Sequence, residues 1–284
     1  MAEVFGAVTG AIGVTALFNN CIDCFDYVQI ARHFGQDFSR YQLRLDVAKC
    51  RLARWGATAN INNDPQLVSD VFADQTTELA QDILKEIVAR FETARKISHR
   101  YEARLDEENR EVCTERDLNS VSQTLHNRFR ALTTGRKNQI GLLKKTAWAL
   151  YDKEHMGRMI ADIITSIKDL EDVFPANPQA VNQLVEMEVE EIHDERELEL
   201  IQEAAEGVDP ALEDVSRRKL QEVTGRNSAG RISGKGHVNV GHTYLDASFS
   251  GFRDDRVNHV DEVNGEETSR VNIGNTYGGR GFWG

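Results

Sequence analysis

Two pairs of reactive residues have the spacing of known chemical motifs. Cys21 and Cys24 form a Cys-x-x-Cys pair, which in redox proteins lies between a strand and a helix. That context is missing here, so two buried helix cysteines are the favoured interpretation. Glu190 and His193 form one Glu-x-x-His motif, whereas a di-iron site needs two. We therefore expect a solvated acidic face there and no metal.

Other catalytic signatures are also missing from the sequence. It contains no Walker-type phosphate loop, no nucleophile elbow and no His-Glu-x-x-His zinc motif. Because no set of nucleophile, base or metal ligands emerges, the sequence predicts a protein that is not an enzyme and has no cofactor.

Two stretches of opposite charge follow one another in the second half of the chain. Residues 118–151 contain no acid, and residues 186–199 are strongly acidic. Either the two stretches face water or each other, or the basic one meets anionic lipid headgroups. The basic side chains are Arg128, Arg130, Arg136, Lys137, Lys144 and Lys145.

The elements that carry these residues are helical from about residue 36 to residue 224. Apolar residues recur there at helical spacing, as in Ile83, Ile87 and Phe91 with Leu79 before them. The further amphipathic segments are residues 146–150, 159–170, 181–192 and 212–223, and the prolines that mark boundaries are Pro65, Pro175 and Pro210. No alternating run long enough for a sheet precedes residue 227, so we expect an all-α, multi-helix bundle.

Composition limits the class of protein. With 284 residues, 40% of them hydrophobic, the chain is long enough for one large domain or two modest ones. A net charge of −12 argues against nucleic acid as a partner. The first residues have no basic charge before the apolar stretch, and the four cysteines show no paired framework. We therefore expect a cytoplasmic location in the resting state.

The first apolar stretch is unusual for a cytoplasmic protein. Residues 4–22 are nineteen positions without a charge, close to the roughly 20 apolar residues of a membrane-spanning helix. Gly6 and Gly10 have the small-residue spacing that allows close helix contact in lipid. Two interpretations stay open, a helix packed on the core of its own domain and a membrane-inserting segment, and both hold if the segment moves. The residues expected to insert are Val4, Phe5, Gly6, Gly10, Ile12, Val14, Leu17 and Phe18.

The last 58 residues, 227–284, contain 11 of the 21 glycines and repeat themselves. The heptapeptide of residues 238–244 returns at 271–277 with five identities, and Asn227 corresponds to Asn258. Alternation of apolar and polar residues within each copy is a strand signature. We therefore divide the chain into a helical domain, 1–226, and a tail, 227–284, with pseudo-repeats 227–244 and 258–277.

The two copies are expected to stack as two rungs of a β-solenoid, with neighbouring molecules supplying the next rungs. Copy one carries Arg231 and Lys235 and no acid, whereas copy two is acidic. Alternation of the copies therefore places Arg231 beside Glu262, and Lys235 near Glu266 or Glu267. Asn227 above Asn258 permits an amide ladder, and Phe282 with Trp283 can cap the apolar interior. The expected interior consists of Ala229, Ile232, Val238, Val240, Val260, Val263, Val271 and Ile273. Before assembly the glycine-rich tail is expected to be disordered.

Several longer motifs resemble the fungal heterokaryon-incompatibility prion proteins of the HET-s/HET-S family over essentially the whole chain. Residues 18–29 (FNNCIDCFDYVQ), 42–46 (QLRLD), 51–56 (RLARWG) and 144–152 (KKTAWALYD) resemble the HeLo domain. The tail, including residues 278–283 (GGRGFW), resembles the prion-forming region.

This resemblance implies a function. A matching amyloid, either a prion aggregate or the N-terminal motif of an NLR-type receptor, would convert the tail into a β-solenoid. Conversion would pull on the last helix, at about residues 210–225, release residues 1–34 into the cell membrane and form a pore that kills the cell. In the family, histidine at the position of His33 marks the killing allotype, and Asp23 is also present. The alternative is a structural or regulatory amyloid protein without membrane activity.

Overall fold

The computed structural model describes residues 13–61, 75–136, 147–224, 227–241, 243–244, 258–265, 269–274 and 276–277. The chain divides into two compact units, one formed by residues 1–192 with 200–215 and one by residues 193–199 with 216–284. The sequence places the domain boundary at residue 226, and this boundary stays a prediction.

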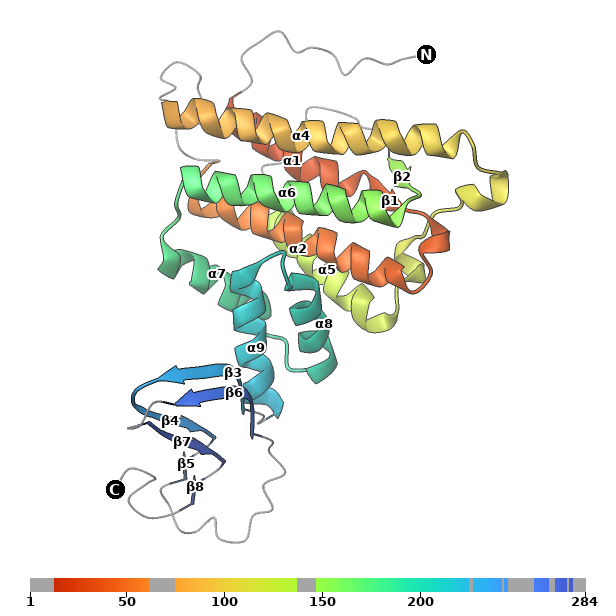
Figure 1. Ribbon diagram of the computed structural model, residues 1–284. Helices are drawn as coiled ribbons and strands as arrows, with labels where there is room; N and C mark the ends of the chain where they lie inside the picture. Colours follow the sequence, from red (N-terminus) through yellow and green to blue (C-terminus); the bar gives the residue numbers. More distant parts are fainter. Residues whose placement is uncertain are drawn as a thin grey trace. The chain divides into compact units, whose positions relative to one another are not determined.

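Helices make up the first unit and the region that connects it to the tail (Figure 1). Their bounds are α1 (Val14–Asp26), α2 (Asp37–Thr58), α4 (Gln75–Glu102), α5 (Ser120–Gly135), α6 (Lys153–Val173), α7 (Pro178–Val189), α8 (Glu195–Ala205) and α9 (Pro210–Thr224). Short 3₁₀ turns lie at η1 (Arg32–Phe34), η3 (Glu107–Arg110) and η4 (Glu115–Asp117).

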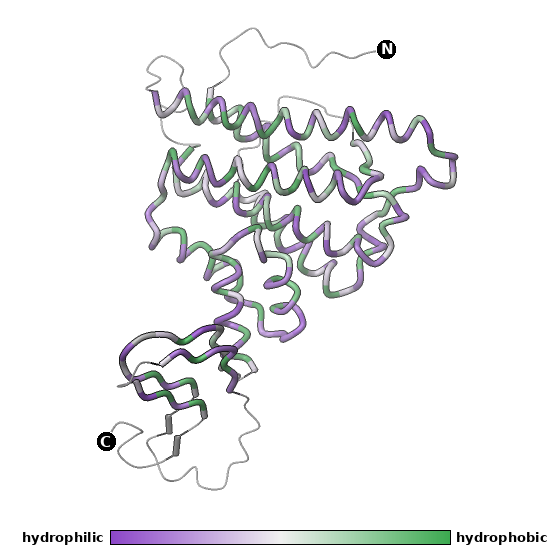
Figure 2. Tube along the Cα trace, in the orientation of Figure 1, coloured by the Kyte–Doolittle hydropathy of each residue, from purple (hydrophilic) through white to green (hydrophobic). Residues whose placement is uncertain are grey.

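Helix α2 lies at the centre of the bundle and contacts α1, α5, α6 and α7. Helix α4 covers α1 and α6 from the other side (Figure 1). The periodic apolar residues explain this packing, because Ile83, Ile87 and Phe91 of α4 are all buried. Leu79 was expected on the same stripe but is 49% exposed, because the buried face of the first turns passes through Thr77 and Ala80. Figure 2 shows hydrophobic and hydrophilic segments alternating along the helices, as expected for amphipathic packing.

The bundle contains one feature that the sequence did not predict, a small parallel sheet. Strand β1 (Val28–Ile30) pairs with β2 (Trp148–Leu150), so the expectation of no sheet before residue 227 is wrong. Residues 148–150 were also expected to be helical. The helix instead begins at Lys153, because the Asp152 carboxylate accepts a hydrogen bond from the backbone N–H of His155 at 2.8 Å and caps α6.

Other helix boundaries follow the sequence signals. Helix α6 ends at Val173 just before Pro175, and α7 and α9 each begin with a proline in the first turn, Pro178 and Pro210. Pro65 lies outside the described residues.

The tail forms two stacked layers with the expected register. Strands of the first copy are β3 (Asn227–Gly234), β4 (His237–Val240) and β5 (Thr243–Tyr244), and those of the second are β6 (Asn258–Gly265), β7 (Arg270–Ile273) and β8 (Thr276–Tyr277). Each strand pairs in parallel with its counterpart, β3 with β6, β4 with β7 and β5 with β8. The offset is 31 residues in the first pair and 33 in the others, as the repeat predicts.

Glycine permits the sharp bend that ends the middle strand of each copy. Gly241 and Gly274, which correspond to each other in the repeat, have φ values of 157° and 154°. Side chains rarely adopt this conformation, so a glycine is required at both positions.

Candidate functional site

The N-terminal segment is docked in the bundle from Val14 onward. Val14, Leu17 and Phe18 lie on α1 and are 1%, 6% and 0% exposed. The interpretation as a helix packed on its own domain therefore holds for this part. The other residues expected to insert into membrane lie outside the described residues: Val4, Phe5, Gly6, Gly10 and Ile12.

Phe18 occupies a closely fitted site on α2. Its ring lies 6.1 Å from the ring of Trp55, measured between centroids. A Cβ atom added to Gly56 would lie 2.5 Å from Phe18 Cε2, far inside van der Waals contact. Gly56 therefore leaves the space that the Phe18 ring fills.

The Cys-x-x-Cys pair lies on the same helix. Cys21 and Cys24 are buried and form no disulfide, and the Cys21 thiol donates a hydrogen bond to the Leu84 carbonyl of α4 at 3.2 Å. This agrees with the expectation of buried helix cysteines. Cys50 of α2 is also buried, and burial raises the pKa of its thiol, so it is held in the unreactive protonated form.

The two residues expected to act as the activity switch lie on different elements. Asp23 is half-buried on α1, whereas His33 is exposed in η1, next to the buried Phe34 ring. Their role stays a prediction.

Within the described part of the chain, no helix combines the length and the apolar character needed to cross a membrane.

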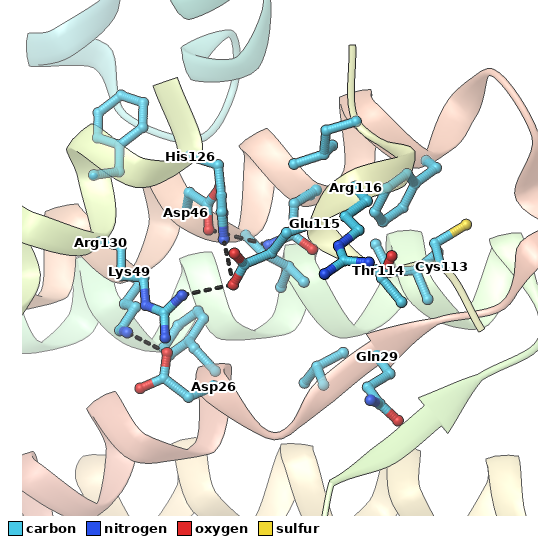
Figure 3. A pocket seen from close by; sticks show the side chains of 18 of the residues that line it. Asp26, Gln29, Asp46, Lys49, Cys113, Thr114, Glu115, Arg116, His126 and Arg130 are labelled. Atoms are coloured by element: carbon cyan, nitrogen blue, oxygen red, sulfur yellow. Dashed lines mark hydrogen bonds and ion pairs between the residues drawn. The ribbon is translucent and has the colours of Figure 1, made fainter. Parts of the chain in front are cut away.

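A pocket of about 790 Å³ lies beside the docked segment (Figure 3). It is bounded by the end of α1, by α2, by residues 113–118 and by α5. Figure 3 shows three pairs among its charged side chains: Lys49 with Asp26 at 2.5 Å, His126 with Asp46 at 2.7 Å, and Arg130 with Glu115 at 2.6 Å. These pairs hold the walls of the pocket together, since the first joins α2 to α1, the second joins α5 to α2 and the third joins α5 to η4.

The buried pair between α2 and α5 is the titratable part of this pocket. His126 Nδ1 contacts the Asp46 carboxylate, and this hydrogen bond raises the pKa of His126. His126 also lies 3.8 Å from Glu115, and Asp46 accepts a further hydrogen bond from Gln42 at 3.1 Å. Burial raises the pKa of Asp46 as well, so both partners of this pair bind a proton more strongly in the folded state.

The basic and acidic stretches meet. Arg128 pairs with Glu191 at 3.1 Å and Arg136 with Glu188 at 2.6 Å, whereas Arg130 pairs with Glu115. The interpretation in which the two stretches face each other is thus supported. The remaining basic residues, Lys137, Lys144 and Lys145, lie outside the described residues. No group of three His, Cys, Asp or Glu that could hold a metal ion, around Glu190 and His193 or elsewhere, is found in the described residues.

Glu188 departs from the expectation of a solvated acidic face. Its side chain is completely buried and pairs with Arg54 of α2, which also pairs with Asp209. The sequence held a signal for this. Glu188 lies three residues after Val185 and four before Ile192, on the apolar face of its helix, and a charge there needs a buried partner.

The expected interior residues of the tail differ in exposure between the two layers. Val240 in the first layer is buried, at 9% exposed, whereas its partner Ile273 in the second is 47% exposed. Val263 is likewise 42% exposed. The half-buried members of the set are Ala229, Ile232, Val238, Val260 and Val271. In a single molecule the second layer thus retains open apolar surface.

Polar pairs join the layers. Arg231 Nε donates to Glu262 Oε2 at 2.6 Å, as the charge pattern predicts. Asn227 lies opposite Asn258 in the register, and a second amide pair that the sequence analysis missed joins Asn272 to Asn239 at 2.5 Å. Asn239 and Asn272 occupy equivalent positions of the repeat, and this equivalence could have predicted their contact. Phe282 and Trp283, and the acids expected near Lys235, lie outside the described residues.

Comparison with known proteins agrees with this two-part architecture. The model of the HeLo family, described as prion-inhibition and propagation, matches residues 6–201, and the Het-s 218-289 model matches residues 219–278. The chain belongs to the HET-s/HET-S family. Across its full length it is 42% identical to heterokaryon incompatibility protein s of Podospora anserina and 41% identical to protein S of that fungus, covering 99% of each.

Solved structures of the HET-s N-terminal domain match the helical part. One aligns with a TM-score of 0.72 at 41% identity, covering 75% of this chain and 99% of that domain, and a doubly substituted variant aligns with a TM-score of 0.71. The HET-s/HET-S family is one of prion-forming, self-assembling proteins that take part in heterokaryon incompatibility, and its members are not named as enzymes.

Proposed function

We propose that this protein is a cell-death effector of heterokaryon incompatibility, switched on by amyloid templating of residues 227–284. The template is a matching prion aggregate or the corresponding motif of an NLR-type receptor. Growth of the tail into a fibril destabilises the helical domain, and residues 1–34 then enter the cell membrane and form a pore.

The observation that carries this proposal is the short connection between helix and strand. Helix α9 ends at Thr224 and β3 begins at Asn227, so two residues join them. At about 3.5 Å per residue, this connection spans roughly 10 Å at full extension.

Geometry makes such a short connection incompatible with an undisturbed bundle in a fibril. Each molecule adds two layers, and paired strands lie about 4.8 Å apart, so each adds about 10 Å along the fibril axis. A folded unit of roughly 200 residues has a radius of gyration of about 16 Å and a width of about 40 Å. About four bundles would compete for the axial length of one, and the short link from residue 215 to β3 limits how far each can move outward. Crowding therefore pulls on α9.

Release of α1 needs a second apolar environment. Exposure of its large buried side chains to water would cost roughly 10 kcal/mol of free energy in total, at 1.5–3 kcal/mol each. These side chains are Val14, Leu17, Phe18, Ile22 and Phe25. A lipid bilayer supplies that environment, which supports membrane insertion rather than release into solution.

Dye-loaded liposomes test the proposal with the full chain. When full-length monomer is mixed with dye-loaded liposomes, addition of preformed fibrils of residues 227–284 should trigger dye release. Monomer alone or fibrils alone should release no dye. Gly10→Lys should abolish this release and leave seeded aggregation unchanged, because it places a charge in the uncharged run. Gln36→Lys, an exposed position beyond the released segment, is the matched control and should behave as wild type. Seeded aggregation without dye release would favour the structural or regulatory alternative.

A further inference from the structure

A buried ion cluster ties the beginning of α9 to the centre of the bundle. The Arg54 guanidinium of α2 donates to the carboxylates of Glu188 at 2.7 Å and of Asp209 at 2.8 Å. The three side chains are at most 4% exposed. Asp209 directly precedes α9, so this ion pair is an anchor between the last helix and α2.

Asp209 supplies one of the two carboxylates that pair with Arg54. The other, Glu188, is shared with Arg136 at 2.6 Å. Withdrawal of Asp209 would leave Arg54 in the interior with only this shared carboxylate. Removing one partner of a buried pair is strongly destabilising, because the remaining charge stays desolvated.

Asp209 also organises the first turn of α9. Its Oδ1 accepts a hydrogen bond from the Leu212 backbone N–H at 3.2 Å, the geometry of a helix N-cap. Arg51, one helical turn before Arg54, donates to the Val208 carbonyl at 2.6 Å and pairs with Glu171. Movement of α9 along its axis would therefore break contacts of both arginines.

The same helical turn of α2 holds the N-terminal segment. Trp55 and Gly56 follow Arg54 directly and form the site of the Phe18 ring. The anchor of the last helix and the docking site of α1 thus occupy three consecutive residues.

A pocket that opens to solvent lies beside the anchor. Its volume is about 360 Å³, and its lining includes Arg54, Trp55, Asp209 and Pro210. The Trp55 indole N–H is buried and has no hydrogen-bond acceptor among the described residues. The pocket therefore gives water a short path to the buried ion pair once the first turn of α9 moves.

We propose that the Arg54–Asp209 ion pair is the latch of the resting state, and that its opening loosens the Trp55–Gly56 site and frees Phe18. Arg54 and Asp209 are positioning residues for the N-terminal segment. The inference rests on the proposed function for its biological meaning, but it concerns a coupling within the unliganded monomer.

Hydrogen exchange on the full-length monomer, without template or lipid, tests this latch. Asp209→Asn keeps the helix cap, because asparagine caps as well as aspartate does, and removes the charge. Exchange should rise at least about tenfold in the first turns of α9 and in α1, which corresponds to about 1.4 kcal/mol. Helix α4 should change less. Asp194→Asn is the matched control. Asp194 is an exposed cap of α8, the helix before α9, and accepts a hydrogen bond from the Glu197 N–H at 3.0 Å. This substitution should leave hydrogen exchange in α1 unchanged.

Two results would overturn the latch. One is faster exchange in α9 with no change in α1, and the other is an equal loss of protection in α1, α4 and α9, which marks a merely structural role. If Asp209→Asn does not fold, pulsed hydrogen exchange on the wild-type chain during seeding tests the latch instead. Helices α9 and α1 should then lose protection together, and before α4 does. Because neither measurement uses liposomes, a failed leakage assay would refute the proposed function without touching the latch.

Discussion

Replacement of Gly56 by alanine tests how firmly the N-terminal segment is docked. The new Cβ would lie 2.5 Å from Phe18 Cε2 and 3.0 Å from Phe18 Cε1, and the ring is completely buried. Overpacking of this kind costs about 1–3 kcal/mol. Alanine regains about 1 kcal/mol of helix propensity, so a net loss of up to about 2 kcal/mol in unfolding free energy is expected.

Gly157→Ala is the matched control because a Cβ there meets no atom within 4 Å. Gly157 lies in α6, so the same substitution should stabilise the chain by about 0.5–1 kcal/mol. Urea denaturation of the full-length monomer measures both. At a slope of about 2 kcal/mol per molar, the midpoint should fall by up to about 1 M for Gly56→Ala and rise by about 0.25–0.5 M for Gly157→Ala. Gly56→Ala should also accelerate fibril-triggered dye release. A Gly56→Ala chain as stable as Gly157→Ala would refute the idea that Phe18 is held against this glycine.

Three further predictions concern the tail and the pocket. Val240→Pro or Ile273→Pro should abolish fibril growth, followed by thioflavin fluorescence, because proline removes a backbone donor from the ladder; growth at the wild-type rate would contradict the pairing of β4 with β7. Arg231→Glu should weaken assembly by about 0.2–1 kcal/mol per interface, and the added change Glu262→Arg should restore part of it. Additive effects on fibril solubility would exclude a direct pair. His126 contacts Asp46, which raises its pKa, and also faces Glu115 and Arg130. Its protonation stabilises the folded state below the ordinary histidine pKa of about 6.5. This stabilisation is lost as the pH rises through the raised pKa of the folded state. The difference in unfolding free energy between wild type and His126→Gln should therefore fall from pH 6 to pH 8, and a difference independent of pH would show that this pair does not titrate with folding.

The sequence predicts the features that depend on neighbours along the chain or on internal repetition. Helical spacing locates α4, α6 and α9, and the repeat predicts the strand register, including the contact of Arg231 with Glu262. Both rest on periodicity, which a single sequence displays.

Features that depend on distant partners were missed. Strands β1 and β2 have three residues each and are separated by more than a hundred positions, too short for an alternating pattern to be visible. The burial of Glu188 required knowledge that Arg54, 134 residues away, lies opposite it. The contact between His126 and Asp46 likewise joins two helices through residues that are 80 positions apart in the sequence.

Three of the four thiols, Cys21, Cys24 and Cys50, are buried, and Cys113 is half-exposed. The wild-type chain therefore carries its own chemical reporters of opening, two on α1 and one on α2 beside the ion cluster. A thiol-specific reagent should modify Cys113 first in the closed monomer, and the delay before Cys21 and Cys24 react times the detachment of α1. No engineered label is needed to follow activation in this protein.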